Sequence, residues 1–207
     1  MSLEFKKLAR ASYAFRRREA LHTFGTVVLV LLASAKVSSS VAIAATLAKR
    51  PINEAVRKLA QALRNIGLLK TLGLARELES LKKSEGYFDV HLRDADLRHE
   101  HALLIATSLR QLTVAEAGCI RSFSLSYNGE IGDIGISAIV RGLPPSLSEL
   151  GLVECGIGDV AGENLLAWAE KASKLLLLCI EGNQFSEDLR KRFISLSNQS
   201  KNINLVI

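Results

Sequence analysis

The chain has 207 residues, of which 48% are hydrophobic, 23% charged and 5% aromatic. This balance excludes an intrinsically disordered chain, a collagen-like chain and a small disulfide-stabilised domain, and the length predicts one domain with an aliphatic core. The net charge of +6 comes from the first 50 residues, where nine Lys and Arg side chains accompany only Glu4 and Glu19. That leaves 18 of the 27 basic and 19 of the 21 acidic side chains for the remainder, a balance that argues against nucleic-acid binding by the folded part.

Residues 1–40 form a basic and partly apolar segment. Six Lys and Arg side chains lie between Lys6 and Arg18, and the apolar run Thr26–Ala35 follows, ending in Ala33-Ser34-Ala35. Two interpretations stay open: a cleaved targeting segment of the secretory or transit type, or a cap in which a basic helix precedes a buried strand over Val27–Leu31. The pattern disfavours a membrane anchor because the apolar run is short and Lys36 follows it.

Three cysteines, Cys119, Cys155 and Cys179, lie far apart and form no CxxC pair. An odd number of widely spaced cysteines is typical of buried thiols in a reducing compartment. We therefore expect a cytoplasmic protein, and the N-terminal segment leaves secretion or targeting to an organelle as the alternative.

Residues 41–207 contain blocks that resemble one another, weakly at first and clearly later. Two weak blocks open with apolar residues that suggest short strands, over 42–52 and 69–74. A third weak block starts at Tyr87 and has Ala95 where the later blocks have Asn or Cys. A recurring block of 20 to 50 residues is the sequence sign of a stacked-repeat architecture.

Three later blocks share one string almost without change. The string LxxLx[LI]xx[NC]x[IF] runs from Leu147 to Ile157 and again, 28 residues later, from Leu175 to Phe185. Ile120–Asn128 fits the same string 27 residues before the first of these, and Ile203-x-Leu205 repeats the strand part at the end. In each block the alternating apolar residues predict a short strand, and later apolar residues follow the 3.6-residue period of a helix. Such units bury their apolar faces only by stacking on one another.

The Asn or Cys of each string falls where the chain turns away from its strand. An Asn side chain there can pair with backbone groups that would otherwise be buried without a partner, and a Cys thiol can donate weakly in a smaller volume. The string therefore predicts structural turn residues at Asn128, Cys155 and Asn183.

The repeated string resembles the leucine-rich repeat, specifically its ribonuclease-inhibitor-like class, most clearly over 87–207. The resemblance implies an α/β solenoid over 41–207 that forms a short arc, with parallel strands on the concave side and helices on the convex side. It also implies a non-catalytic module that binds a protein partner through the concave face; a structural subunit of a larger assembly, organellar or otherwise, is the alternative. The candidate partner-binding residues are Asp89, His91, Arg93, Ser122, Ser124, Ser126, Glu149, Val153, Glu154 and Glu181.

Two motifs could indicate ligand chemistry, but the repeat accounts for both. Gly156-x-Gly158-x-x-Ala161 has the form of a dinucleotide-binding turn, yet glycines recur at the other turns and Asp159 would repel a phosphate. His99-x-His101 lacks metal-ligand spacing and fits the start of a helix. Since the sequence also has no GxSxG elbow, we expect no enzyme activity, no cofactor and no metal.

Overall fold

The computed structural model describes residues 38–81, 86–199 and 203–207, with side chains from residue 52 onward. Contacts divide the chain into two units, Met1–Ala48 and Lys49–Ile207, and the sheet lies in the second. The strand expected over Val27–Leu31 and the Ala33-Ser34-Ala35 site fall outside the described residues, so both stay predictions.

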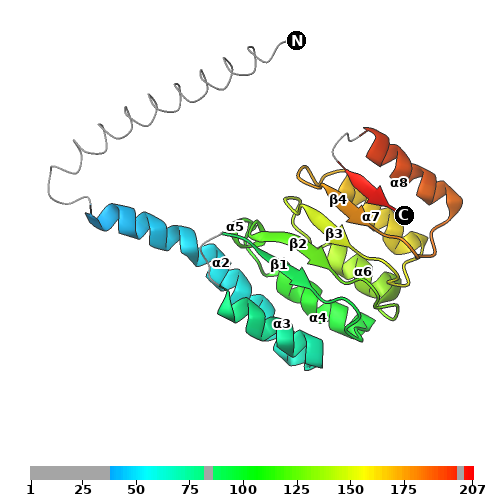
Figure 1. The fold of residues 1–207 in the computed structure, drawn as a ribbon. Coiled ribbons are helices and arrows are strands. Elements are labelled where there is room, and N and C mark those ends of the chain that lie inside the picture. The colour runs from blue at the N-terminus through cyan, green and yellow to red at the C-terminus, as the bar shows by residue number, and fades with distance from the viewer. Residues whose placement is uncertain (1–37, 82–85, 200–202) are drawn as a thin grey trace, which may run out of the picture. The chain divides into compact units, whose positions relative to one another are not determined.

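Within the described residues, five parallel strands form one open sheet in which the strands lie in chain order (Figure 1). Each strand pairs with the next in parallel, so the chain must cross back between every two strands. The sequence predicts a strand in each of the five blocks from Tyr87 onward, and the structure confirms them. The strands are β1 (Phe88–His91), β2 (Ile120–Ser124), β3 (Glu149–Gly151), β4 (Leu177–Cys179) and β5 (Asn204–Val206).

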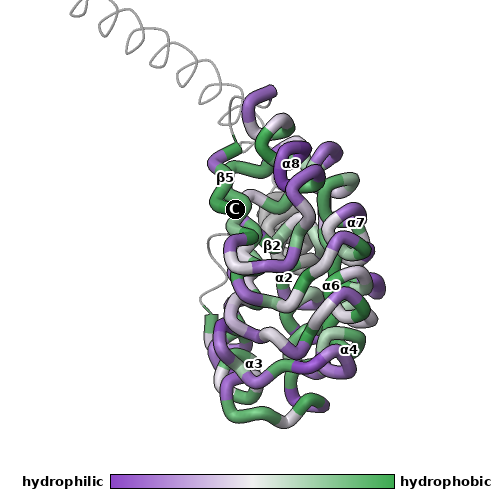
Figure 2. The backbone as a smooth tube through the Cα atoms, turned by 90° about the vertical axis from the view of Figure 1, so that its right-hand side faces the viewer, coloured by the Kyte–Doolittle hydropathy of each residue, from purple (hydrophilic) through white to green (hydrophobic). Residues whose placement is uncertain are grey.

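A helix follows each of the first four strands, which makes the fold α/β. Figures 1 and 2 both show these helices stacked in chain order, and α4 packs on α6, α6 on α7 and α7 on α8. Hydrophobic and hydrophilic stretches alternate along them in Figure 2, as expected of helices that bury one side. The helices are α4 (His99–Arg110), α6 (Gly132–Val140), α7 (Asp159–Ala169) and α8 (Glu187–Gln199), and a one-turn helix, α5 (Val114–Ala117), precedes β2.

The core is built from rows of apolar side chains that run across the sheet. One row consists of paired strand residues: Val90, Phe123, Leu150, Leu178 and Leu205. The next row, just past the strand ends, is at most 1% exposed and consists of Leu92, Leu125, Leu152 and Ile180. Burying a leucine side chain contributes roughly 1.5–3 kcal/mol, so these rows are a main source of stability.

The two weak blocks upstream are helical, which corrects the expectation of strands at 42–52 and 69–74. α2 (Ser38–Ile66) covers the first of these segments and α3 (Leu69–Ser80) the second. Both helices are rich in Ala, Leu, Lys and Arg, which favour helices. Apolar residues three positions apart fit a helix as well as the opening of the repeat string, so spacing alone could not distinguish the two.

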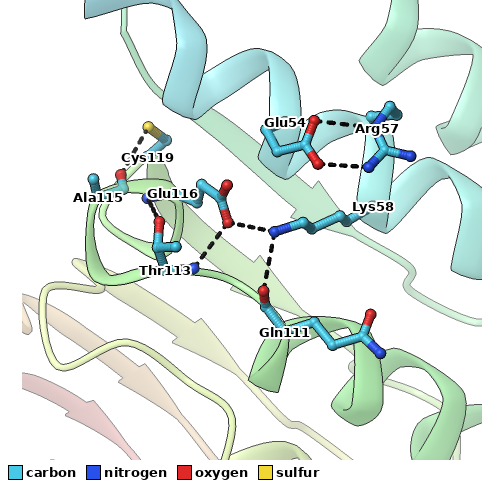
Figure 3. Close-up of polar contacts among 8 residues, drawn as sticks. All are labelled: Glu54, Arg57, Lys58, Gln111, Thr113, Ala115, Glu116 and Cys119. Carbon is cyan, nitrogen blue, oxygen red and sulfur yellow. Dashed lines mark hydrogen bonds and ion pairs between the residues drawn. The ribbon is translucent and has the colours of Figure 1, made fainter.

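A largely buried ion pair ties the second half of α2 to the connection that leads into β2 (Figure 3). Lys58 Nζ lies 2.8 Å from Glu116 Oε2 and donates to the Gln111 carbonyl oxygen at 3.0 Å. The Thr113 N–H donates to the same carboxylate at 2.8 Å, and Glu116 is 7% exposed. Burial acts to raise the pKa of Glu116, but the hydrogen bonds from Lys58 and Thr113 and the Lys58 charge outweigh it and hold that pKa below its ordinary value.

Candidate binding face of the sheet

The helices α4, α6 and α7 lie on one side of the sheet (Figure 1), and we call the other side the open face. Successive side chains of a strand point to opposite sides, so residues paired with one another across parallel strands share a face. The register therefore places two rows on the open face: Asp89, Ser122, Glu149, Leu177 and Asn204; and His91, Ser124, Gly151, Cys179 and Val206.

A third row continues the open face just past the strand ends. Backbone hydrogen bonds between neighbouring blocks extend the strand register there. They run from the Asp94 N–H to the Ser126 carbonyl oxygen, from the Tyr127 N–H to that of Val153 and from the Glu154 N–H to that of Glu181. The third row is therefore Arg93, Ser126, Val153 and Glu181. The structure thus brings the sequence-predicted strand residues onto one face, with Glu154 at its border.

The charged side chains at the β1 end of the open face are paired within the molecule. Arg121 Nε donates to Asp89 Oδ1 at 3.0 Å, and the hydrogen bonds that Arg121 donates to Asp89 raise the pKa of Arg121. The same guanidinium lies over the Tyr87 ring, 4.2 Å from its centroid. Arg93 lies over the Tyr127 ring at 5.0 Å. These contacts hold the side chains in defined positions.

The centre of the open face carries very short side chains. Ser122 and Ser126 are 5% and 2% exposed, so these two predicted binding residues offer almost no surface. Ser126 instead accepts a hydrogen bond from the Val153 N–H at 3.1 Å. A Cβ at Gly151 would lie 2.8 Å from Ser124 Oγ, which shows how closely β2 and β3 fit here. Ser124 is the one serine of the three that keeps partial exposure.

The β3–β4 part of the open face is different, because its carboxylates form no ion pairs with described residues and its apolar side chains are partly exposed. Glu149, Glu154 and Glu181 are exposed, and none forms an ion pair or side-chain hydrogen bond with any described residue. Val153, Leu177 and Cys179 are half-buried between them. We call these six residues the acidic–apolar patch. Val206, paired with Cys179 across β4 and β5, is 37% exposed beside it.

The turn asparagines pair with the block that precedes each of them. Asn128 Oδ1 accepts from the N–H groups of Ala95 and Leu97 at 2.8 and 3.0 Å. Asn183 Oδ1 accepts from Cys155 and Ile157 at 3.0 and 3.1 Å. Each amide also donates to carbonyl oxygens of its own and the preceding block. Both side chains therefore pair with buried backbone groups at the point where the chain leaves its strand.

Cys155 occupies the equivalent turn with a different pairing. Its thiol donates to the Leu125 carbonyl oxygen at 3.2 Å, and the residue is fully buried. Burial raises the pKa of this thiol to about 12, so it stays protonated at physiological pH. This thiol is thus buried, hydrogen-bonded and protonated.

Two carboxylates link neighbouring blocks in a way that sequence reasoning missed. Asp133 Oδ1 accepts from the N–H groups of Gly158 and Ala161, at 2.9 and 3.1 Å. Asp159 Oδ1 accepts from the Ser186 N–H at 2.8 Å, and this bond lowers the pKa of Asp159. The recurring Gly-Asp pair at the helix starts was the available signal, but a spacing does not say which distant N–H groups a carboxylate meets.

In the Gly156-x-Gly158-x-x-Ala161 turn, side chains of the protein itself already accept hydrogen bonds from the backbone N–H groups. Asp133 takes the N–H groups of Gly158 and Ala161, and Asn183 takes that of Ile157. Gly156 has φ +69°, and a Cβ there would overlap the carbonyl oxygen of Gly129. A phosphate would need the N–H groups that these side chains occupy, so the structure supports the tight-turn interpretation.

The histidine motif lies at the start of α4, as expected. His101 Nδ1 accepts from the Arg98 N–H at 3.1 Å, and His99 Nδ1 lies 3.4 Å from Glu100 Oε2. A cavity of about 540 Å³ opens beside this helix end, and the Arg98–Glu130 ion pair at 3.0 Å lies in its wall. In the part of the chain that the structure describes, no three His, Cys, Asp or Glu side chains gather as metal ligands would.

The chain matches no protein-family model and no curated protein. Across residues 38–81, 86–199 and 203–207, no helix combines the length and apolar character needed to cross a membrane. A functional interpretation therefore depends on the geometry of the open face and the repeat pattern.

Proposed function

We propose that the chain is a leucine-rich-repeat protein of the ribonuclease-inhibitor-like class and that its open sheet face binds a protein partner without catalysing a reaction. The repeat spacing of 27 and 28 residues, the parallel strands, the helix after each strand and the asparagine turns support this class. In this proposal the open face is the concave side of a short arc.

The observation that carries the binding role is the contrast between the two sides of the sheet. The helix side is filled by buried aliphatic side chains, whereas the open face displays exposed charged groups, partly exposed apolar groups and two arginines stacked on tyrosines. Such a mixture, held on short strands that cannot rearrange, is typical of protein interfaces, in which Tyr and Arg are enriched.

A catalytic role fits the open face poorly. His91 Nε2 lies 2.9 Å from Ser122 Oγ, which is the spacing of a nucleophile and its base. However, Ser122 is 5% exposed, and the nearby Asp89 carboxylate is engaged by Arg121 rather than by His91. The pair is better explained as a contact that orients His91.

The three cysteines are free thiols, and we place the protein in a reducing compartment on that ground.

The binding role is tested with a bulky neutral side chain at the centre of the open face. A partner captured by the wild type is identified, purified and titrated against the Ser124→Tyr variant. The Ser195→Tyr variant on α8, at an exposed serine outside the sheet, is the matched control. We expect Ser124→Tyr to raise the Kd about tenfold or more and Ser195→Tyr to leave it unchanged. Equal affinity of Ser124→Tyr and wild type would place binding elsewhere.

A permanent subunit of a larger assembly is the second candidate, and one observation favours it. Leu177, Cys179 and Val206 form an apolar strip that reaches the β5 edge of the sheet. Apolar strips at sheet edges are typical of stable subunit contacts. Size-exclusion chromatography of a native extract distinguishes the two: a subunit elutes wholly with its assembly, whereas a recognition module is found largely as the free chain.

A further inference from the structure

We propose that the acidic–apolar patch binds a protein segment that carries Lys or Arg side chains beside apolar ones. This inference rests on the proposed binding function of the open face and names the part of it that makes contact, together with the chemistry of the partner.

The first step is the distribution of unpaired charge. At the β1 end Asp89 is neutralised by Arg121, and the guanidinium of Arg121 is stacked on Tyr87. Asp94, at the border, is paired with Lys70 at 2.9 Å. Charges that are already satisfied within the molecule offer little to a partner, because binding would have to break those contacts.

The second step is the opposite situation in the acidic–apolar patch. Its three carboxylates have no ion-pair or side-chain hydrogen-bond partner among the described residues. Arg93, just past the end of β1, is a cation of the open face that contacts the Tyr127 ring and forms no ion pair with a described residue. Three negative charges against one positive charge leave a net negative field over this part of the face. That field attracts a cationic segment and repels anionic lipid and nucleic acid.

The third step is the arrangement of apolar groups among these charges. Leu177 is paired with Glu149 across β3 and β4, and Cys179 with Gly151. Val153 and Glu181 occupy the row beyond. Removing Leu177, Cys179 and Val153 from water supplies the affinity, and the surrounding carboxylates select the partner by charge. A long Lys or Arg side chain suits this pattern, because its aliphatic stem can cover apolar surface while its charged end meets a carboxylate.

The experiment selects binders for the purified protein from a displayed library of random peptides. Peptides of about ten residues reach about 33 Å when extended, which exceeds the roughly 19 Å width of five strands. The selected peptides are sequenced, synthesised and titrated against the wild type and the variant with Glu149→Gln, Glu154→Gln and Glu181→Gln. The matched control neutralises three exposed acids outside the sheet, through Glu77→Gln in α3, Glu170→Gln just after α7 and Asp188→Asn in α8.

We expect the selected peptides to be enriched in Lys and Arg next to apolar residues. The Kd of such a peptide should rise about tenfold or more in the patch variant and stay within about twofold in the control. It should also rise when salt is increased from about 0.05 M to about 0.5 M, because exposed charges are screened. Thermal melts check that all variants are folded.

Three results would overturn the inference: no peptide recovered above background, selected peptides without a basic excess, or equal affinity for wild type and the patch variant. The Ser124→Tyr variant separates this failure from failure of the proposed function. If Ser124→Tyr abolishes binding while the patch variant does not, the open face still binds but through other chemistry. If Ser124→Tyr and the patch variant both bind as the wild type does, the open face is not the binding surface at all.

Discussion

At two of the turns, a single asparagine side chain supplies the hydrogen bonds that buried backbone groups cannot obtain from water. Asn183 satisfies two N–H groups of the preceding turn and donates to the carbonyl oxygens of Leu152 and Ile180. Leaving a buried backbone group without a partner costs about 1–3 kcal/mol. The identity of this one residue therefore affects two neighbouring blocks.

The Cys155→Asn variant should fold with stability close to that of the wild type, because Asn occupies the equivalent turn in the blocks on either side. We expect its free energy of unfolding, measured by urea denaturation, to change by less than about 1 kcal/mol. By contrast, Asn183→Ala should lose about 3 kcal/mol, since several buried groups lose their partner. Loss of soluble Cys155→Asn protein would contradict the equivalence of these turns.

At the scale of elements, glycine permits turns and close packing that other residues would block. Gly156 has a positive φ, and a Cβ there would overlap the backbone of the preceding turn. Gly73, inside α3, has no positive φ and nothing within 4 Å of the position that a Cβ would occupy. The same substitution should therefore have opposite effects at the two positions.

The Gly156→Ala variant should lose about 2 kcal/mol or more of its free energy of unfolding, from backbone strain and the clash with Gly129. Gly73→Ala should gain about 0.5–1 kcal/mol, because alanine favours the helix. Both values come from chemical denaturation under the same conditions. If Gly156→Ala were as stable as the wild type, the close approach of neighbouring turns would be refuted.

The attachment of α2 should depend on pH through Glu116. Because its pKa is lower in the folded protein than in the unfolded chain, the stabilisation by Lys58 is complete above the unfolded value, near 4.5, and is lost as pH falls through the folded value. At neutral pH the Glu116→Gln variant should be less stable than the wild type by about 1–3 kcal/mol. The difference should shrink as pH falls below about 4.5. A difference that does not vary with pH would show that the ion pair does not contribute.

At the scale of the whole molecule, stability comes from blocks stacked on their neighbours. α4, α6, α7 and α8 pack in chain order, and the strands pair in the same order. In such a linear stack a defect in one block removes the support of both neighbours.

The Leu152→Asp variant should therefore unfold more than its own block. Leu152 is fully buried just past the end of the central strand β3, and an unpaired carboxylate there should cost about 4 kcal/mol or more. Circular dichroism should show a large loss of signal or a much lower melting temperature. Val153→Asp, one residue later and half-buried on the open face, is the control that should melt close to the wild type. An unchanged melt of Leu152→Asp would contradict the stacked-repeat assignment.

The strands and turn residues from Tyr87 onward could be predicted from sequence, because alternating apolar residues and a turn Asn leave local signals. The helices of α2 and α3 could not be told from weak repeats, since apolar spacing alone suits both. The Lys58–Glu116 pair and the link from Asp133 to Gly158 join residues far apart in the chain. The burial of Ser122 and Ser126 depends on side chains from neighbouring blocks, so the sequence pattern of a single block does not predict it.

The most direct measurement is the rate of alkylation of Cys179 with and without bound partner or selected peptide. Cys179 lies on the open face, whereas Cys119 lies next to α5, and burial raises the pKa of both half-buried thiols. Cys119 is thus an internal control in the same molecule. Binding should slow modification of Cys179 about tenfold or more at saturating ligand and leave Cys119 unchanged. Unaltered modification of Cys179 in the saturated complex would contradict binding through the open face.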